Sequence, residues 1–277
     1  MFPRQTKQRC TGSVSAIPGV CRTGLGCRPT YHPPVDDFGE RTGAALVTGG
    51  TGGIGAAICR MLAERGSDVA FTYRANAAAA EVLEAELRAL GAEVTATAVD
   101  LADEAAAGAV VAATVERFGG LHTLVHAAGP HVPQIHLSRV EPSAYRAQIE
   151  GEAVAFFNLV HPALPLLREA AGSIVAVTTA ATRRYPVRDG LSSGTKGAVE
   201  AVVRAIAAEE GRFGIRANCV GPGMLTDGMA ARLMASGDLE GPQAVPRDRE
   251  AREEMAVEEL GLQTGTVGFR PRQSART

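Results

Sequence analysis

The sequence predicts an α/β fold, a single-domain doubly wound parallel sheet with helices on both faces. Three observations lead to this prediction. From Ala44 onward short apolar runs alternate with longer amphipathic stretches, no internal repeat or long linker divides them, and 45% of the residues are hydrophobic, which suits one sizeable core. Strands of about four to eight residues that alternate with helices imply βαβ crossovers, and these produce parallel strands covered on both sides.

Six apolar runs are predicted to be buried strands, and the five amphipathic stretches between them are predicted to be helices. The strands are Ala44–Thr48, Asp68–Thr72, Val94–Ala98, Thr123–Ala127, Ser173–Thr178 and Arg216–Val220. The helices lie near Gly53–Arg65, Asn76–Leu90, Glu104–Phe118, Ser143–Leu167 and Ser192–Phe213.

Composition narrows the class of protein. The 277 residues carry a net charge of -2 with bases and acids interspersed, and only 4% are aromatic, so the basic, aromatic-rich face that binds nucleic acid is missing. No apolar run reaches the roughly 18 residues of a membrane span, and no signal-peptide core is present. The five cysteines match no zinc or disulfide pattern. We expect a cytoplasmic protein without a metal site that binds neither nucleic acid nor membrane.

The chain divides into three parts by composition. Residues 1–41 mix Gly, Pro, Thr, Cys and Arg without periodicity and are predicted to be a disordered extension. Residues 42–236 hold the alternating pattern and form the folded domain. Residues 237–277 form an atypical charged tail, since 240–259 is strongly charged and 261–277 contains no apolar strand.

The first predicted strand runs directly into a glycine-rich turn and then into a helix. Glycines let the backbone approach a pyrophosphate closely, and the helix N-terminus offers free N–H groups and a positive dipole. The strand before and the helix after the turn favour a dinucleotide site over a turn without a ligand. The predicted contacts are Thr48, Gly49, Thr51, Gly53, Ile54 and Gly55.

The end of the second strand indicates which dinucleotide binds. An acidic residue at this position would bind the 2′-hydroxyl of NAD, but the chain has Tyr73-Arg74 there. A guanidinium pairs well with a 2′-phosphate, so NADP(H) is favoured over NAD(H). The alternative is that Arg74 is a solvated residue at the start of a helix.

Two further segments end at the same edge of the sheet, where open α/β sheets bind ligands. Asp100 and Leu101 follow the third strand, and His126-Ala127-Ala128-Gly129 ends the fourth. They are predicted to border the adenine and the ribose. Asp100 could equally cap the next helix, and His126 could be a core histidine with its hydrogen bonds satisfied.

Together these motifs resemble the short-chain dehydrogenase/reductase (SDR) family over roughly residues 44–227. The pattern Thr48-Gly-x-x-x-Gly53-x-Gly55, Asp100, and Pro222-Gly223 after the sixth strand match in order and spacing. The resemblance is greatest to the 3-oxoacyl-carrier-protein-reductase-like branch. It implies an NAD(P)-binding Rossmann fold, Pro222-Gly223 beside the cofactor, hydride transfer with a small carbonyl or alcohol substrate, and a homodimer or homotetramer built on the fourth and fifth helices.

The catalytic residues of the family are Asn, Ser, Tyr and Lys, and this chain matches them only in part. The lysine is Lys196, which the resemblance places on the nicotinamide ribose. Thr179 occupies the serine position and keeps a hydroxyl. The tyrosine position is Ser192, whose aliphatic hydroxyl is a poor acid compared with a phenol.

The asparagine position is predicted to hold Glu152, by counting back without gaps from Ala163-Leu164-Pro165. Asn158 lies six residues further on, too far without a shift of the helix. Glu152 could pair with Lys196 or extend a proton relay, although its carboxylate would then oppose the acidifying effect of the lysine. Equally, Glu152 could be a glutamate on the helix surface.

Tyr185 is the only tyrosine near the expected substrate site. It lies on the loop between the fifth strand and the helix of Lys196. We hypothesise that it replaces the missing acid, with Thr179 orienting the substrate and Lys196 holding the ribose. Alternatively, Tyr185 packs the loop. The three arginines around it, Arg183, Arg184 and Arg188, are either solvated or recognise an acidic substrate or carrier.

Two functions follow from these residues. The first is an NADP(H)-dependent oxidoreductase acting on a carbonyl or alcohol, and the second is a weak or inactive NADP(H)-binding protein with a regulatory or scaffolding role. The family also ends on a seventh strand, which residues 237–277 do not predict. Loss of this strand would expose apolar surface and lower the stability.

Overall fold

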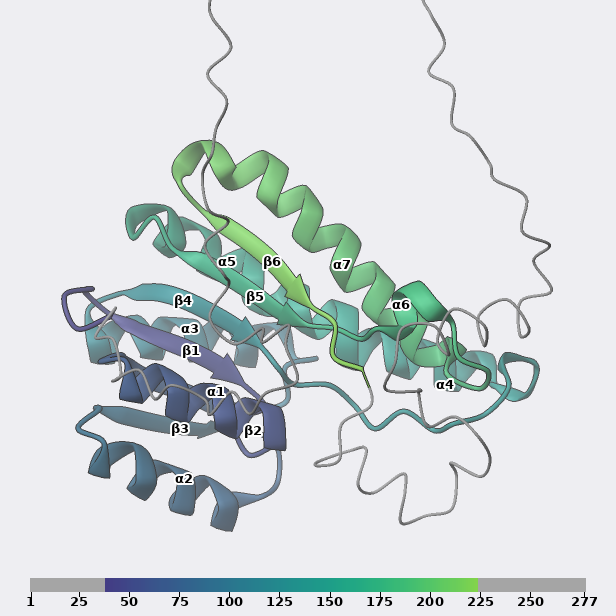
Figure 1. Cartoon of the computed structure of the whole chain (residues 1–277), viewed down its shortest axis with the longest axis horizontal. Coiled ribbons are helices and arrows are strands. Elements are labelled where there is room, and N and C mark those ends of the chain that lie inside the picture. Colours follow the sequence, from purple (N-terminus) through teal and green to yellow (C-terminus); the bar gives the residue numbers. More distant parts are fainter. Residues whose placement is uncertain (1–37, 224–277) are drawn as a thin grey trace, which may run out of the picture. The chain divides into compact units, whose positions relative to one another are not determined.

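The computed structural model describes residues 38–223, and six parallel strands form its centre (Figure 1). The strand order is β3-β2-β1-β4-β5-β6, and every neighbouring pair is parallel. The order reverses between β1 and β4, which creates the crevice where such sheets bind ligands. The predicted doubly wound α/β fold is confirmed.

The strands and helices alternate as predicted, with small differences at their ends. The strands are β1 (Ala44–Thr48), β2 (Asp68–Tyr73), β3 (Val94–Ala98), β4 (Leu121–His126), β5 (Ser173–Val177) and β6 (Arg216–Val220). The helices are α1 (Gly53–Glu64), α2 (Ala77–Ala89), α3 (Glu104–Phe118), α4 (Pro142–Ile149), α5 (Ala155–Glu169), α6 (Ala181–Arg184) and α7 (Gly190–Glu210), with short turns η1 (Leu137–Arg139), η2 (Glu150–Val154) and η3 (Gly211–Phe213).

The helix predicted over 143–167 is the largest difference. It is divided into α4 and α5 by η2, a π-helical turn of 5 residues. Two prolines, Pro162 and Pro165, lie inside α5 without ending it. The helix predicted to start at Ser192 begins instead at Gly190, and its last residues form the 3₁₀ turn η3.

Local residues fix several of these ends. The side chains of Asn76 and Asp103 accept hydrogen bonds from the third residue of α2 and α3, which are N-caps of the expected kind. The predicted alternative that Asp100 caps α3 is therefore wrong. Gly119 ends α3 at a φ of 77°, a left-handed conformation that favours glycine.

Two hydrophobic cores cover the two faces of the sheet. Residues of α3, α5 and α7 pack on one face around Leu46, Leu124 and Ile174, and residues of α1 and α2 pack on the other around Val47 and Phe71. Alternate residues of one strand therefore serve opposite cores, as the period of two in a strand requires. The carboxyl edge of the sheet, where the site lies, is thus supported by a hydrophobic core on each face.

Strand β6 is the last described element and lies at one edge of the sheet (Figure 1). Its final residue, Val220, is 55% exposed. The predicted disordered extension, apart from its last residues, and the predicted charged tail without a seventh strand lie outside the described residues. Within those residues no helix is long and apolar enough to cross a membrane.

Candidate cofactor and active site

The glycine-rich turn between β1 and α1 forms an anion cradle. Gly49 has a φ of 68°, and a Cβ on Gly55 would overlap the carbonyl oxygen of Gly49, so both positions require glycine. The first hydrogen bond of α1 runs from Ala56 N to the carbonyl oxygen of Gly52, and no acidic residue occupies the first turn. The N–H groups of residues 53–55, which include predicted contacts Gly53 and Ile54, are therefore available to a phosphate.

The side chain of Thr48, the residue before this turn, is buried and contacts the end of β4. Its Oγ1 accepts hydrogen bonds from the backbone N–H of Ala127 and of Ala128, both at 3.1 Å, and lies 3.1 Å from His126 Nδ1. The hydroxyl thus contacts two N–H groups at the end of β4 and the imidazole at once. Thr48 is fully buried and links the ends of β1 and β4, and its predicted contact with the cofactor stays a prediction.

His126 is a core histidine, as one predicted alternative had it, but its hydrogen bonds are only partly satisfied, since Nε2 is buried without a partner in the described part of the chain. It is fully buried, and its ring lies 5.2 Å from that of Phe156. Burial, and secondarily the charge of Lys196, lower the pKa of His126 to about 3. The imidazole is therefore neutral at physiological pH and holds the structure beneath Ala127 and Ala128.

Tyr73 and Arg74 lie at the end of β2, at the same edge as the cradle. The Arg74 side chain is 77% exposed, and its Nη2 donates to Asp100 Oδ2 at 3.1 Å. Asp100 Oδ1 accepts from the N–H of Ala102, which fixes the turn after β3. Such an exposed ion pair contributes only about 0–1 kcal/mol, so the guanidinium can turn to a ligand at little cost.

The centre of the site is an ion pair between Lys196 and Glu152. Lys196 Nζ donates to Glu152 Oε1 at 2.7 Å and to the carbonyl oxygen of Val177 at 3.2 Å. Glu152 is only 1% exposed, so the prediction of a surface glutamate is wrong and the pairing with Lys196 is the alternative that the structure shows. One ammonium N–H of Lys196 remains for another acceptor.

The environment of Glu152 disfavours its charged form. Burial raises the pKa of Glu152, whereas the charge and hydrogen bond of Lys196 lower it, and the net direction is upward. Its Oε2 is buried without a hydrogen-bond partner in the described part of the chain, directly beneath Gly129. A Cβ on Gly129 would lie 2.8 Å from that oxygen, so the glycine lets the backbone cover the pair closely.

The π turn η2 explains why Glu152, and not Asn158, reaches Lys196. Glu152 is in the middle of this turn, whereas Asn158 on α5 donates to the carbonyl oxygens of Leu101 and Ala102. The two side chains therefore serve different parts of the sheet edge. That Glu152 occupies the family's asparagine position stays a prediction, whereas its contact with Lys196 is observed.

Thr179 and Ser192 lie beside the pair but are used differently. Thr179 Oγ1 accepts from the N–H of Ala181 at 3.1 Å at the start of α6, and the side chain is half-buried. Ser192 is buried one turn before Lys196 on α7. Ser192 precedes Lys196 by four residues, so the two lie on the same side of α7.

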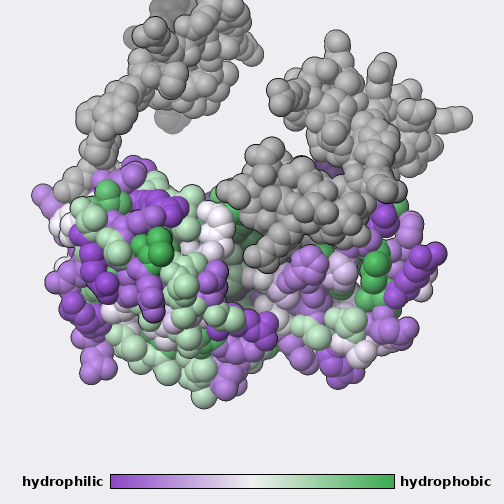
Figure 2. Space-filling model, turned by 90° about the horizontal axis from the view of Figure 1, so that it is seen from below, coloured by the Kyte–Doolittle hydropathy of each residue, from purple (hydrophilic) through white to green (hydrophobic). Residues whose placement is uncertain are grey.

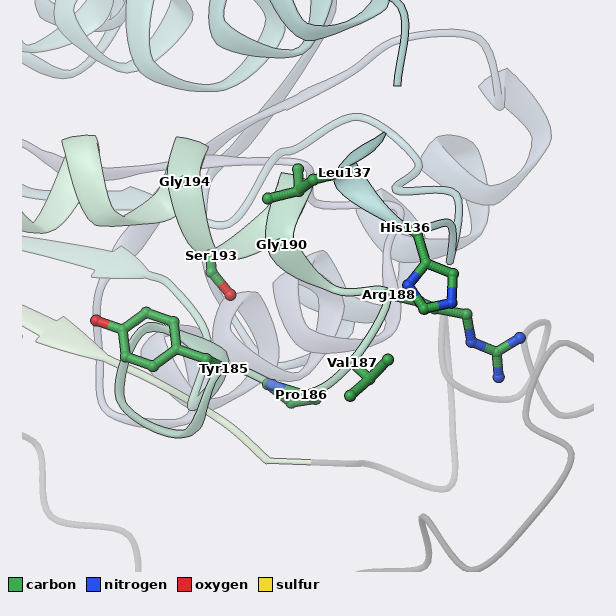
Figure 3. Close-up of a pocket in the computed structure, with 9 residues that line it drawn as sticks. All are labelled: His136, Leu137, Tyr185, Pro186, Val187, Arg188, Gly190, Ser193 and Gly194. Carbon is green, nitrogen blue, oxygen red and sulfur yellow. The ribbon is translucent and has the colours of Figure 1, made fainter. Parts of the chain in front are cut away.

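Tyr185 lies at the C-terminal end of α6 and not in the buried centre of the site. Its side chain is 68% exposed, and its backbone has a φ of 48°. Figure 3 shows it at one end of a pocket of about 460 Å³, with its ring directed away from His136 and Arg188. The other lining residues come from η1, the loop before α7 and the start of α7: Leu137, Pro186, Val187, Gly190, Ser193 and Gly194.

Glu200 was missed by the sequence analysis. Its Oε1 accepts from Thr178 Oγ1 at 3.2 Å and from Thr182 Oγ1 at 2.6 Å, and its Oε2 accepts from Arg204 at 2.8 Å. A buried glutamate one turn after Lys196 thus joins the end of β5, α6 and α7. The only signal in the sequence was an acidic residue on the apolar face of the predicted helix.

One face of the molecule is mixed in hydropathy (Figure 2). On the face shown in Figure 2, hydrophilic and weakly hydrophobic residues are interspersed and strongly hydrophobic ones are scattered.

Pro222 and Gly223, also predicted beside the cofactor, are the last described residues and follow β6 at the same edge, where the carbonyl oxygen of Pro222 accepts from Ala180 N at 3.0 Å. The sheet edge therefore gathers the predicted cofactor residues in one place.

This arrangement fits a bound dinucleotide. The glycine-rich turn offers N–H groups to a pyrophosphate, and Arg74 is exposed at the end of β2. Lys196 has one ammonium N–H left for an acceptor, and Gly129 lets the backbone pass close to its ion pair with Glu152. A parallel sheet with this cradle at its carboxyl edge defines a nicotinamide-dinucleotide-binding protein of the Rossmann class.

Comparison with known proteins gives the family. Residues 49–256 match the profile described as "Enoyl-(Acyl carrier protein) reductase". The chain is 31% identical over 213 residues to L-fucose dehydrogenase of Rattus norvegicus, covering 74% of this chain and 76% of that one. It is 30% identical over 195 residues to a 3-oxoacyl-(acyl-carrier-protein) reductase of Staphylococcus aureus, covering 70% and 79%.

Solved structures agree. A short-chain dehydrogenase from Burkholderia cenocepacia in complex with NADP superposes with a TM-score of 0.65 at 30% identity, over 82% of this chain and 91% of that one. NAD⁺-bound xylitol dehydrogenase shares the fold with a TM-score of 0.68 at 24% identity, over 79% and 85%.

The chain belongs to the short-chain dehydrogenase/reductase family, oxidoreductases that transfer a hydride between a nicotinamide cofactor and a small-molecule substrate. This membership favours an enzyme over the non-catalytic alternative.

Proposed function

We propose that this oxidoreductase uses NADP(H) to interconvert a carbonyl compound and an alcohol. The observation that carries the cofactor preference is Arg74, an exposed guanidinium at the end of β2 where the strand ends without a carboxylate. A 2′-phosphate would pair with this guanidinium, and the Asp100 carboxylate that now holds it can be displaced because both side chains are exposed.

The experiment is a fluorescence titration of the purified protein with NADPH and with NADH. We expect NADPH to bind more tightly, and Arg74→Ala to weaken NADPH binding by about tenfold or more while changing NADH binding by less than about threefold. Arg117→Ala is the matched control, since Arg117 is an exposed arginine paired with Glu93 on the edge of the sheet. Tighter binding of NADH by the unmodified protein would contradict the preference.

The roles proposed within the site follow from the contacts of each group. Lys196 would hold the nicotinamide ribose through the N–H that Glu152 and Val177 leave to it. Thr179 would orient the substrate oxygen through its hydroxyl. Glu152 acts as a positioning residue: it holds the ammonium at 2.7 Å, and in its carboxylate form it opposes the field that would acidify a phenol at position 192.

Turnover is tested by NADPH oxidation against a panel of aldehydes and ketones, and by NADP⁺ reduction against the corresponding alcohols. Turnover would establish the carbonyl–alcohol reaction. NADPH binding without turnover of any compound would leave a cofactor-binding protein and overturn the proposed activity.

A homo-oligomer is the second part of the proposal. Exposed apolar side chains lie on α5, where Phe157 is 51% exposed, and a row of exposed small residues, Ala201, Ala205 and Ala208, lies on α7. Small residues allow two helices to approach closely, so these helices suit a symmetric contact between copies. Light scattering should give a dimer or tetramer, and Phe157→Glu should shift it toward the monomer; a monomeric unmodified protein would contradict the assembly.

A further inference from the structure

Two contacts join the walls of the pocket shown in Figure 3. In the first, Gln134 Nε2, in the loop after β4, donates to Asp189 Oδ1 at 3.1 Å. In the second, Leu137 packs on Gly190, where an added Cβ would lie 2.6 Å from Leu137 Cδ1. Each contact joins residues that are far apart in sequence. The loop after β4 is therefore fixed against the loop before α7, and the pocket between them is a built part of the fold.

Two nitrogen-bearing side chains meet at one end of this pocket. His136 lies between the two residues of the first loop that make these contacts, and Arg188 directly precedes the two residues of the second. Figure 3 shows the two side chains near each other, with Tyr185 at the opposite end. Within the part of the chain that the structure describes, no aspartate or glutamate lines the pocket. The end formed by His136 and Arg188 therefore favours an anionic group.

The backbone at Arg188 is unusual for an arginine. Arg188 is the third residue of a turn that is closed by a hydrogen bond from Asp189 N to the carbonyl oxygen of Pro186 at 3.1 Å. Its φ is 71°, a left-handed conformation that glycine adopts without strain and that is strained for an arginine. Residues other than glycine in such conformations gather at functional sites. Arg188 is also half-buried, so this loop favours a ligand-binding arginine over a solvated one.

The rest of the pocket is mainly apolar. Leu137, Val187 and Tyr185 all line it, and all three are large side chains that remain exposed to solvent. Exposed apolar side chains that gather around a hollow indicate a binding site. The volume of about 460 Å³ lies in the range of pockets that hold small organic molecules. A ligand with an anionic head and an aliphatic body therefore matches both parts of the lining.

This pocket and the ion pair of Lys196 lie on different sides of α7. Successive residues of an α-helix are about 100° apart, so the lining residues Gly190, Ser193 and Gly194 share one side of the helix. Ser192 and Lys196 share another side, about 130° further round the axis. The pocket is therefore separate from the centre where the hydride is transferred.

We propose that this pocket is a second ligand site, which binds an aliphatic carboxylate. The carboxylate lies on Arg188 and His136, and the aliphatic chain runs along Leu137 and Val187. A guanidinium has five N–H donors in a planar fork that matches a carboxylate, so it holds this group beside its other contacts. An imidazole N–H of His136 supplies a further donor. The proposal develops, for Arg188, the predicted alternative that the arginines around Tyr185 recognise an acid.

The test is a calorimetric titration of the full chain with octanoate and with octanamide, its neutral analogue. We expect octanoate to bind at least about tenfold more tightly, and Arg188→Gln to weaken octanoate binding by about tenfold or more with octanamide binding unchanged. Arg184→Gln is the matched control, because Arg184 is an exposed arginine of α6 outside the pocket lining, and its octanoate affinity should stay within about twofold. Equal binding of the two probes, or equal effects of the two variants, overturns the proposal.

Arg188→Gly separates the loss of binding from a loss of folding. Glycine relieves the strain at a φ of 71°, so Tm should equal or exceed that of the unmodified protein while octanoate affinity falls as in Arg188→Gln. NADPH affinity should be the same with and without octanoate. Competition between octanoate and NADPH would assign octanoate to the cofactor crevice and overturn the proposal. A change of oligomeric state in Arg188→Gln without weaker octanoate binding would assign the pocket to a contact between copies, which also overturns it.

Discussion

At the scale of residues, two changes in the site depend on each other. A free lysine ammonium would lower the pKa of a neighbouring phenol, but here Lys196 is neutralised by Glu152 at 2.7 Å, and position 192 is a serine. A phenol at 192 would gain little from such a lysine. We therefore propose that Glu152 and Ser192 act together and that another group supplies the proton.

This coupling predicts the behaviour of a double variant. Ser192→Tyr alone should give little added turnover, because Glu152 still neutralises the lysine. Ser192→Tyr combined with Glu152→Asn should raise kcat/KM at least about tenfold over Ser192→Tyr alone, since the freed ammonium can acidify the phenol. Steady-state kinetics with Glu152→Asn as the control measure this, with melting curves to show that each variant folds. Equal rates in the single and double variants would refute the coupling.

At the scale of elements, Glu200 determines where α6 lies. Two threonine hydroxyls and two arginines converge on its carboxylate: Thr178, Thr182, Arg204, and Arg183 at 3.6 Å. The adjacent Thr179, which is proposed to orient the substrate, depends on this network for its place. Glu200 is thus a support for the loop between β5 and α7 rather than a member of the reacting set.

Removing this support should loosen α6 and the substrate side of the site. We expect Glu200→Ala to cost about 2–3 kcal/mol of unfolding free energy, because it removes the buried carboxylate on which two threonine hydroxyls and Arg204 converge, and to raise KM for substrate more than it changes NADPH affinity. Glu200→Gln keeps acceptors for the threonines and should recover about half of the loss. Denaturant unfolding and titration measure the two effects; equal losses of substrate and cofactor binding would argue against a local role.

The same elements show what the sequence could predict. Periodic patterns located all six strands and most helix ends, because burial imposes those patterns directly. The glycine-rich turn indicated which edge of the sheet holds the cofactor site. The count to Glu152 indicated the ion pair with Lys196, which was one of two predicted alternatives for that glutamate. The π turn, the Glu200 network and the Asp189–Gln134 contact lay beyond reach, because each depends on groups that are distant in sequence and follow no period.

At the scale of the whole molecule, buried histidines make the stability depend on acid. Burial, and secondarily the charge of Arg41, lower the pKa of His122 to about 4, and that of His126 falls to about 3. The unfolded chain takes up these protons near pH 6.5, so it binds more protons than the folded protein below that pH. The stabilisation is complete above pH 6.5 and is lost as the pH falls toward 4. The raised pKa of Glu152 acts in the opposite direction, since its contribution is lost as the pH rises.

We therefore expect His122→Gln to flatten the acid limb of the stability curve. Between pH 7 and pH 5 the unmodified protein should lose about 2 kcal/mol through His122 alone, and the variant should lose correspondingly less. His161→Gln is the control, because His161 is an exposed histidine of α5. Urea unfolding at the two pH values measures the difference. Parallel curves for the unmodified protein and His122→Gln would show that His122 is not the group responsible.

The π turn between α4 and α5 also bears on how this chain tolerates insertions and deletions. A π turn holds one more residue than the α-helical turn it replaces, so it can be regarded as an inserted codon absorbed by the helix. Removing one residue of this turn, such as Gly151, would let the segment wind as regular α-helix with α4 and α5 kept near their present orientations. Rewinding the turn without such a loss would instead rotate everything before it by about 100° relative to α5, and Tyr145, whose hydroxyl lies against α7 at Gly194, would leave its contact. A single-codon deletion within the π turn should therefore disturb the packing of α4 less than the same deletion elsewhere in α4 or α5.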